Sequence, residues 1–215
     1  VSPDLAALKF GPESRKPDAA VCLQDSLDML AEAVYALHEY CAHRKWYEER
    51  RETAKPDAAV YFARFYLSDV ALRLYAAAEH LAAAILAIMD LSEADLGKPK
   101  KCRTSLQARV GKHMRDVWPD HPLTLAVRGL DDATEWHRAM EFRNRWVHSQ
   151  PPTVDGLGLV WRRGNRWEHD EPSGKWKLGV GGGAPPEYSV SDLHQFLEPA
   201  VVKFRDALAL VADHY

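Results

Sequence analysis

One long apolar segment constrains the fold of this chain more than any other feature. Residues 56–90, PDAAVYFARFYLSDVALRLYAAAEHLAAAILAIMD, are rich in alanine and leucine. Pro56 should end the preceding helix, and Asp57 opens the next one. A helix that is apolar around most of its circumference must be covered on several sides. The segment therefore predicts a central helix surrounded by other elements.

Four further helices are expected around this segment. Residues 18–55 carry apolar side chains near 3.6-residue spacing, with acidic residues on the opposite face. A shorter helix is predicted over 105–118, capped by Ser105 or Thr104, and another over 122–148. Ser191-Asp192 predicts the cap of a last helix, which Pro199 should kink. The fold class expected is all-α, as a helical bundle.

The composition changes after residue 150. Residues 151–188 contain eight of the twelve glycines and five prolines around two short runs, LGLVWRR and KWKLGV. Turn signals next to such runs predict a small β-hairpin, inserted within residues 151–190 before the last helix. Residues 1–17 contain three prolines and no periodicity, and are expected to form an irregular arm. One helical domain, 18–215, should follow.

Charge, cysteines and motifs narrow the classes of function. The net charge of −3 lacks the strongly basic footprint of many nucleic-acid-binding proteins, so any RNA contact must use a local patch. Three widely spaced cysteines without a CxxC argue against disulfides and a thiolate zinc site. No metal site and no cofactor are expected. The apolar run at 81–89 is too short to span a bilayer and no secretory signal is evident, so we expect a cytoplasmic protein that does not engage membranes.

The stretch EFRNRWVHSQPP, residues 141–152, concentrates the side chains suited to chemistry. Arg143 and His148 are separated by roughly 140° on an ideal helix, so they are not expected to share a face. Asn144 and His148, at i and i+4, do share one. To meet His148, Arg143 would have to bend round, the helix would have to loosen near Pro151, or a second copy of the chain would have to supply the partner.

Arg143, Asn144 and His148 at the end of a long helix resemble the HEPN superfamily, whose motif is Arg-x4–6-His, often RNxxxH. Other arginines of this chain meet the loose spacing, but Arg143 alone among them is followed by asparagine. The resemblance covers about 18–148 and 191–215. It implies an antiparallel bundle and a homodimer whose motifs face each other across a cleft. A subgroup of the family continues His-x-Tyr, whereas His148 is followed by Ser149-Gln150.

The resemblance also implies a function, a metal-independent endoribonuclease in which Arg143 and His148 are catalytic and Asn144 supports them. Histidine can take a proton from the 2′-hydroxyl of RNA or protonate the leaving 5′-oxygen, and a guanidinium can hold the phosphorane. A toxin or anti-phage role, with a cognate antitoxin or other protein partner, is expected by analogy. The alternative is a catalytically inactive module of the same fold that binds a nucleotide or protein, with these cations complementing a helix dipole.

Two further groups of residues are candidates. The resemblance implies an acidic or polar residue of the central helix near the motif, and Glu79 or Asp69, with His80 nearby, could fill that place. An internal Asp69–Arg73 pair on a solvated strip is the simpler interpretation. The segments WRRGNRW and KWK interleave aromatic and basic residues, a pattern that suits RNA stacking or a tryptophan-filled hairpin. The possible RNA-binding residues are Arg145, Arg162, Arg163 and Arg166.

Overall fold

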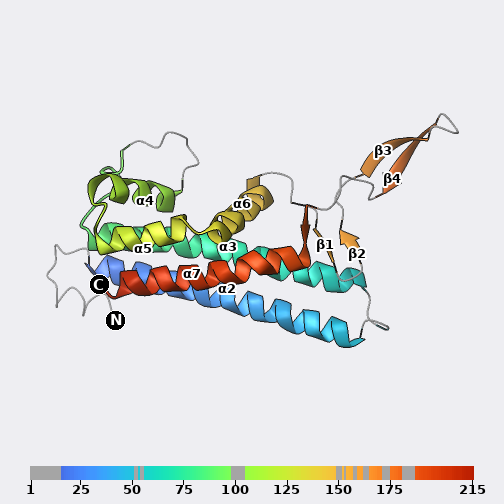
Figure 1. The fold of residues 1–215 in the computed structure, drawn as a ribbon, viewed down its shortest axis with the longest axis horizontal. Helices are drawn as coiled ribbons and strands as arrows, with labels where there is room; N and C mark the ends of the chain where they lie inside the picture. Colours follow the sequence, from blue (N-terminus) through green and yellow to red (C-terminus); the bar gives the residue numbers. More distant parts are fainter. Residues whose placement is uncertain are drawn as a thin grey trace.

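In the computed structural model the chain is an all-α helical bundle, which confirms the expected fold class (Figure 1). The structure describes residues 16–50, 53, 56–97, 105–148, 152, 154–156, 159–161, 165–170, 175–180 and 187–215. Within the strands, side chains are described only for Val154, Tyr188 and Ser189. The expected arm lies outside these residues, except that Lys16 and Pro17 are already helical.

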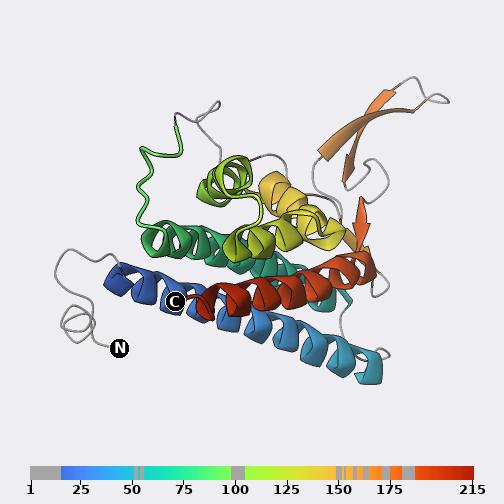
Figure 2. The ribbon, with the colours of Figure 1, turned by 60° about the vertical axis from the view of Figure 1, so that its left-hand side comes forward.

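Three long helices form the body of the bundle. They are α2 (Lys16–Arg50), α3 (Pro56–Ile88) and α7 (Val190–Ala212), and each contacts the other two. Three shorter helices complete the described bundle: α4 (Leu106–Val117), α5 (Pro122–Asp131) and α6 (Thr134–His148). They lie together along one side of the long helices (Figures 1 and 2).

Helix α3 occupies the centre, as its composition predicts. It contacts α2, α4, α6 and α7, and its residues Leu67, Leu74 and Ile85 are buried. The stretch Tyr61–Ile88 is also long and apolar enough to cross a membrane, and 56% of its most apolar part is buried inside the fold. The central helix of a globular protein meets the same two criteria.

The prediction of one helix over 122–148 is wrong. Helix α5 ends at Asp131, and α6 begins at Thr134. The backbone N–H of Asp132 donates to the carbonyls of Arg128 and Leu130, which closes α5. Glycine at 129 and aspartates at 131 and 132 weaken the helix at this point because their helix propensities are low. The break lets α5 pack on α4 and α7 while α6 packs on α3 and α7.

The strands pair differently from the expected hairpin. Strand β1 (Val154–Gly156) is antiparallel to β2 (Leu159–Trp161) and parallel to β5 (Tyr188–Ser189). Strand β3 (Asn165–Asp170) is antiparallel to β4 (Lys175–Val180). The two runs expected to pair with each other therefore lie in β2 and β4, which belong to separate sheets. Strands β3 and β4 extend away from the helices at one end of the molecule (Figures 1 and 2).

The last helix begins earlier than predicted, because its cap is Ser189 and not Ser191. The Ser189 hydroxyl accepts the N–H of Asp192, and the Asp192 carboxylate accepts the N–H of Ser189. This reciprocal capping box satisfies two backbone donors at the point where β5 ends. Pro199 lies inside α7, and the kink expected there stays a prediction.

Candidate functional site

Arg143 and His148 meet within a single copy of the chain. The Nη1 of Arg143 lies 3.3 Å from Nε2 of His148 and donates to Oδ1 of Asn144 at 3.0 Å. The long arginine side chain bridges the angular separation that an ideal helix imposes, along the last two turns of α6. Of the three ways in which the pair could form, the structure shows the first: Arg143 bends round to His148, and no second copy is needed to form the contact.

The guanidinium of Arg143 is also stacked on an aromatic ring from another helix. Its Cζ lies 3.6 Å from the ring centroid of Tyr75, on α3. The Nε of Arg143 is buried and has no hydrogen-bond partner in the described part of the chain. Burial raises the pKa of Tyr75, the charge of Glu79 raises it further, and the Arg143 cation lowers it. The charge of Arg143 therefore acts on the ionisation of the Tyr75 phenol.

These residues line a pocket of about 450 Å³ between α3, α4, α5 and α6. Among its described lining residues Arg143 is the permanent cation, Asp131 is the anion, and two histidines, His137 and His148, are groups that can transfer protons. The guanidinium of Arg143 is the group in this pocket that can bind an anionic or phosphate-bearing ligand. The lining consists of Tyr75, Ser105, Gln107, Ala108, Asp131, Trp136, His137, Met140, Arg143, Asn144 and His148.

His137 is a member of this pocket that the motif does not include. It lies seven residues before Asn144 and eleven before His148, spacings that place all three on one face of α6. The same spacing is visible in the sequence and could have identified His137. Eleven residues correspond to about 16 Å of helix rise, so the two histidines lie toward opposite ends of the pocket.

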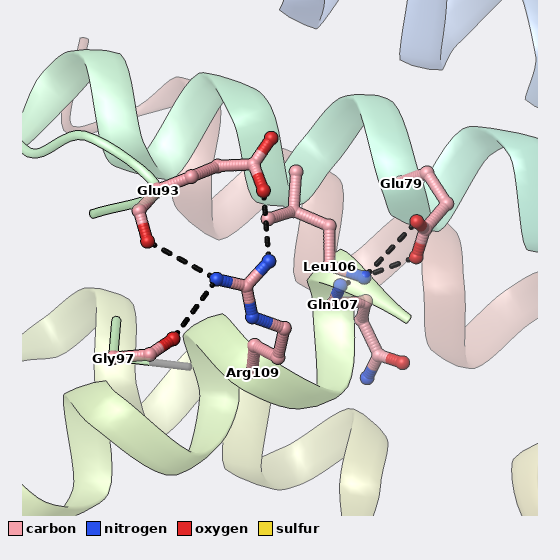
Figure 3. A network of polar contacts seen from close by, with 6 residues as sticks. All are labelled: Glu79, Glu93, Gly97, Leu106, Gln107 and Arg109. Atoms are coloured by element: carbon pink, nitrogen blue, oxygen red, sulfur yellow. Dashed lines mark hydrogen bonds and ion pairs between the residues drawn. The ribbon is translucent and has the colours of Figure 1, made fainter. Parts of the chain in front are cut away.

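The N-terminus of α4 forms another wall, held in place by Glu79. The Glu79 carboxylate accepts the backbone N–H groups of Leu106 at 3.0 Å and Gln107 at 3.2 Å (Figure 3). The side chain of Gln107 donates to Asp131 at 2.6 Å. Asp131 also pairs with Arg115. Glu79 therefore binds the start of α4 and is not among the residues that line the pocket.

Ser105 and Arg109 fix the start of α4 through hydrogen bonds. The Ser105 hydroxyl accepts the N–H of Ala108, so Ser105 is the cap. Arg109 donates to the side chain and carbonyl of Glu93 and to the carbonyl of Gly97 (Figure 3). These bonds fasten α4 to the turn that follows α3, and so fix the wall of the pocket.

Asp69 and His80 are not brought to the pocket. Arg73 pairs with Asp69 at 3.3 Å and with Glu32 at 2.5 Å, while His80 lies 3.7 Å from Asp25. These contacts link α3 to α2, on a different side of α3 from the Tyr75–Arg143 stack. The structure thus contains the internal Asp69–Arg73 pair that the sequence offered as the simpler interpretation.

Of the arginines considered for RNA binding, Arg145 is described with its side chain and is not among the residues that line the pocket. Arg145 forms an ion pair with Glu187, and this hydrogen-bonded partner raises the pKa of Arg145. The pair ties α6 to the residue before β5. Arg162 and Arg163 lie outside the described residues, and for Arg166 only the backbone is described, opposite Gly179.

Within the described ranges, no cluster of three or more His, Cys, Asp or Glu side chains is arranged to hold a metal ion. His43, on α2, stacks on Phe62 and Tyr66 of α3. Comparison with known proteins found no family model that matches the chain, and no significant match to a curated protein or a solved structure.

Proposed function

We propose that this chain is a metal-independent endoribonuclease of HEPN type, with Arg143 and His148 as the catalytic residues. The observation that carries the proposal is the contact of the Arg143 guanidinium with His148 Nε2, both of which line the pocket. Metal-free cleavage of RNA needs a proton-transfer group beside a fixed positive charge, and this pair supplies both. Asn144 supports the arginine by accepting from Nη1.

The geometry suggests how the pair works. A guanidinium has donors only, so its hydrogen bond to His148 requires Nε2 to accept, with the imidazole neutral and its proton on Nδ1. If the guanidinium donated to a scissile phosphate in place of His148, Nε2 would be free to accept the proton of the 2′-hydroxyl. The 2′-oxygen then attacks phosphorus, and the 5′-oxygen leaves with a proton from an acid. The products are a 2′,3′-cyclic phosphate and a 5′-hydroxyl.

We propose a homodimer because the leaving 5′-oxygen needs an acid to protonate it. His137 is the second histidine of the pocket, but about 16 Å of helix rise separates it from His148, too far for both to reach one phosphate. The same motif on a second copy of the chain, facing the first across a cleft, would provide the acid. RNA and a second copy are therefore the partners we propose, and a toxin or anti-phage setting rests on family analogy.

The test is cleavage of a labelled RNA pool in EDTA by wild type and by His148→Ala. We expect EDTA-resistant cutting by wild type that leaves 2′,3′-cyclic phosphate ends, and a loss of at least about 100-fold in the variant. His38→Ala is the matched control, because His38 is an exposed histidine on α2 away from the pocket.

Two results would contradict the proposal. One is full activity of folded His148→Ala. The other is no cutting by folded wild type across varied RNAs, and saturable binding of a nucleotide or protein would then favour the inactive binding module.

A further inference from the structure

The stack of Tyr75 under Arg143 points to a role for a residue outside the motif. We infer that Tyr75 is the positioning residue of the site, holding the Arg143 guanidinium so that Nη1 reaches His148. The inference rests on the proposed function for its meaning in catalysis. The contact between Arg143 and the Tyr75 ring does not depend on that function, because it is a distance in the structure.

The arginine needs such support because of its place on α6. Five residues separate Arg143 from His148, and the side chain must fold back across the helix surface to make the 3.3 Å contact. Hydrogen bonds to Asn144 and His148 fix the position of Nη1 but leave the plane of the guanidinium free to rotate. A ring face at 3.6 Å fixes that plane, since a guanidinium prefers to lie over an aromatic face.

The stack also explains the unpaired donor. The Nε of Arg143 is buried without a hydrogen-bond partner among the residues that the structure describes, an arrangement that costs free energy. The attraction between the cation and the ring offsets part of that cost. Without Tyr75 the side chain would gain by swinging outward to hydrate Nε, and the contact with His148 would be lost.

Tyr75 is well placed to act as a fixed platform. It is a half-buried residue of α3, the central helix, and its neighbours Leu74 and Ala78 are buried in the core. One turn later on the same helix, Glu79 holds the start of α4. A catalytic side chain on the last turns of a short helix thus rests on the most enclosed helix of the bundle, the arrangement expected for a preorganised site.

Two variants separate the role of the Tyr75 ring from the role of its hydroxyl. If the ring face is what matters, Tyr75→Phe should keep most of the activity, whereas Tyr75→Leu should lower kcat about 10-fold with a smaller change in KM. Arg143 would remain present in both variants, so the difference isolates its orientation. An equal loss in the two variants would show that the hydroxyl acts instead, and full kcat in Tyr75→Leu would overturn the inference.

A second measurement does not depend on RNA cleavage. Tyrosine labelled with 13C at Cζ reports the pKa of each phenol by NMR, and the Tyr75 signal is assigned by its loss in Tyr75→Phe. Arg143→Met should raise the pKa of Tyr75, because the cation lowers it, and Glu79→Gln should lower that pKa, because the carboxylate raises it. An unchanged Tyr75 pKa in Arg143→Met would refute the stacking contact. If the shift occurs but wild type cuts no RNA, the proposed function fails and the contact stands.

Discussion

The guanidinium of Arg143 is held in three ways at once. It donates to Asn144, contacts Nε2 of His148 and lies over the ring of Tyr75. A planar group with donors in a fixed fork can meet all three demands, whereas an ammonium cannot. The shape of the side chain, in addition to its charge, is therefore part of the site.

Arg143→Lys tests the importance of the shape, because it keeps the positive charge and removes the planar guanidinium. We expect RNA cleavage to fall about 100-fold, in the range found when one transition-state donor is removed. The free energy of unfolding should change little, because Arg143 is only half-buried and lies near the end of α6. Initial rates and urea unfolding on the same preparation measure both quantities. Wild-type rates in Arg143→Lys would show that charge alone suffices.

Residues of the site differ in how far the sequence could predict them. Arg143, Asn144 and His148 lie in one short motif, so the sequence identifies them together, but it leaves open how Arg143 reaches His148. Tyr75 and Asp131 come from other helices, and only the packing of α3 and α5 against α6 brings them together. Glu79 was expected beside the motif, and it lies on the right helix, but its carboxylate is used by the N–H groups of α4.

At the scale of elements, the boundaries of helices depend on a few caps. The box at the start of α7 joins Ser189 to Asp192 by a backbone and a side-chain hydrogen bond, and both lower the pKa of the Asp192 carboxyl. A carboxyl whose pKa is lower in the folded state stabilises the fold above its unfolded pKa of about 4. That contribution is lost as the pH falls through the folded value.

Asp192→Asn should therefore lower the free energy of unfolding by about 1 kcal/mol at pH 7, a modest value because the side chain is exposed. The difference from wild type should shrink as the pH falls from 7 through the lowered pKa of the Asp192 carboxyl, where that group becomes protonated. Urea unfolding of both proteins along this pH range measures it. A difference independent of pH would mean that the charge of Asp192 does not matter to the cap.

The elements that the sequence failed to predict share a physical reason. Periodicity continues from α5 into α6, and the break at Asp132 depends on how the flanking helices pack on different neighbours. The pairing of β1 with β5 joins segments more than thirty residues apart, which no local pattern reveals. The long helices α2 and α3, by contrast, carry their own signals in spacing and in Pro56.

At the scale of the whole molecule, the bundle was the most predictable property. An apolar helix of 33 residues leaves few alternatives to a helical shell, and the structure has α2, α4, α6 and α7 in contact with it. The number of copies that act together is a separate question, because the Arg143–His148 pair forms in one chain.

Dilution tests the proposed homodimer. If the leaving-group acid comes from a second copy, cleavage per chain should fall as the protein is diluted below its dissociation constant, and sedimentation should show dimer giving way to monomer over the same range. The reason is mass action on a site completed by two copies. Cleavage per chain that stays constant across the dimer-to-monomer transition would show that one copy carries the whole reaction.

The position of the site at the end of α6 has a consequence for how it can be lost. The last turn of a helix lacks half of its backbone hydrogen bonds, and opening such an end costs far less free energy than unfolding the core. The Arg143–His148 contact exists only while these turns are wound, and the Arg145–Glu187 pair is one bond that holds them. Local melting of a few residues would therefore dismantle the site while the bundle stays intact. We therefore expect loss of the site and loss of the fold to be two separate transitions.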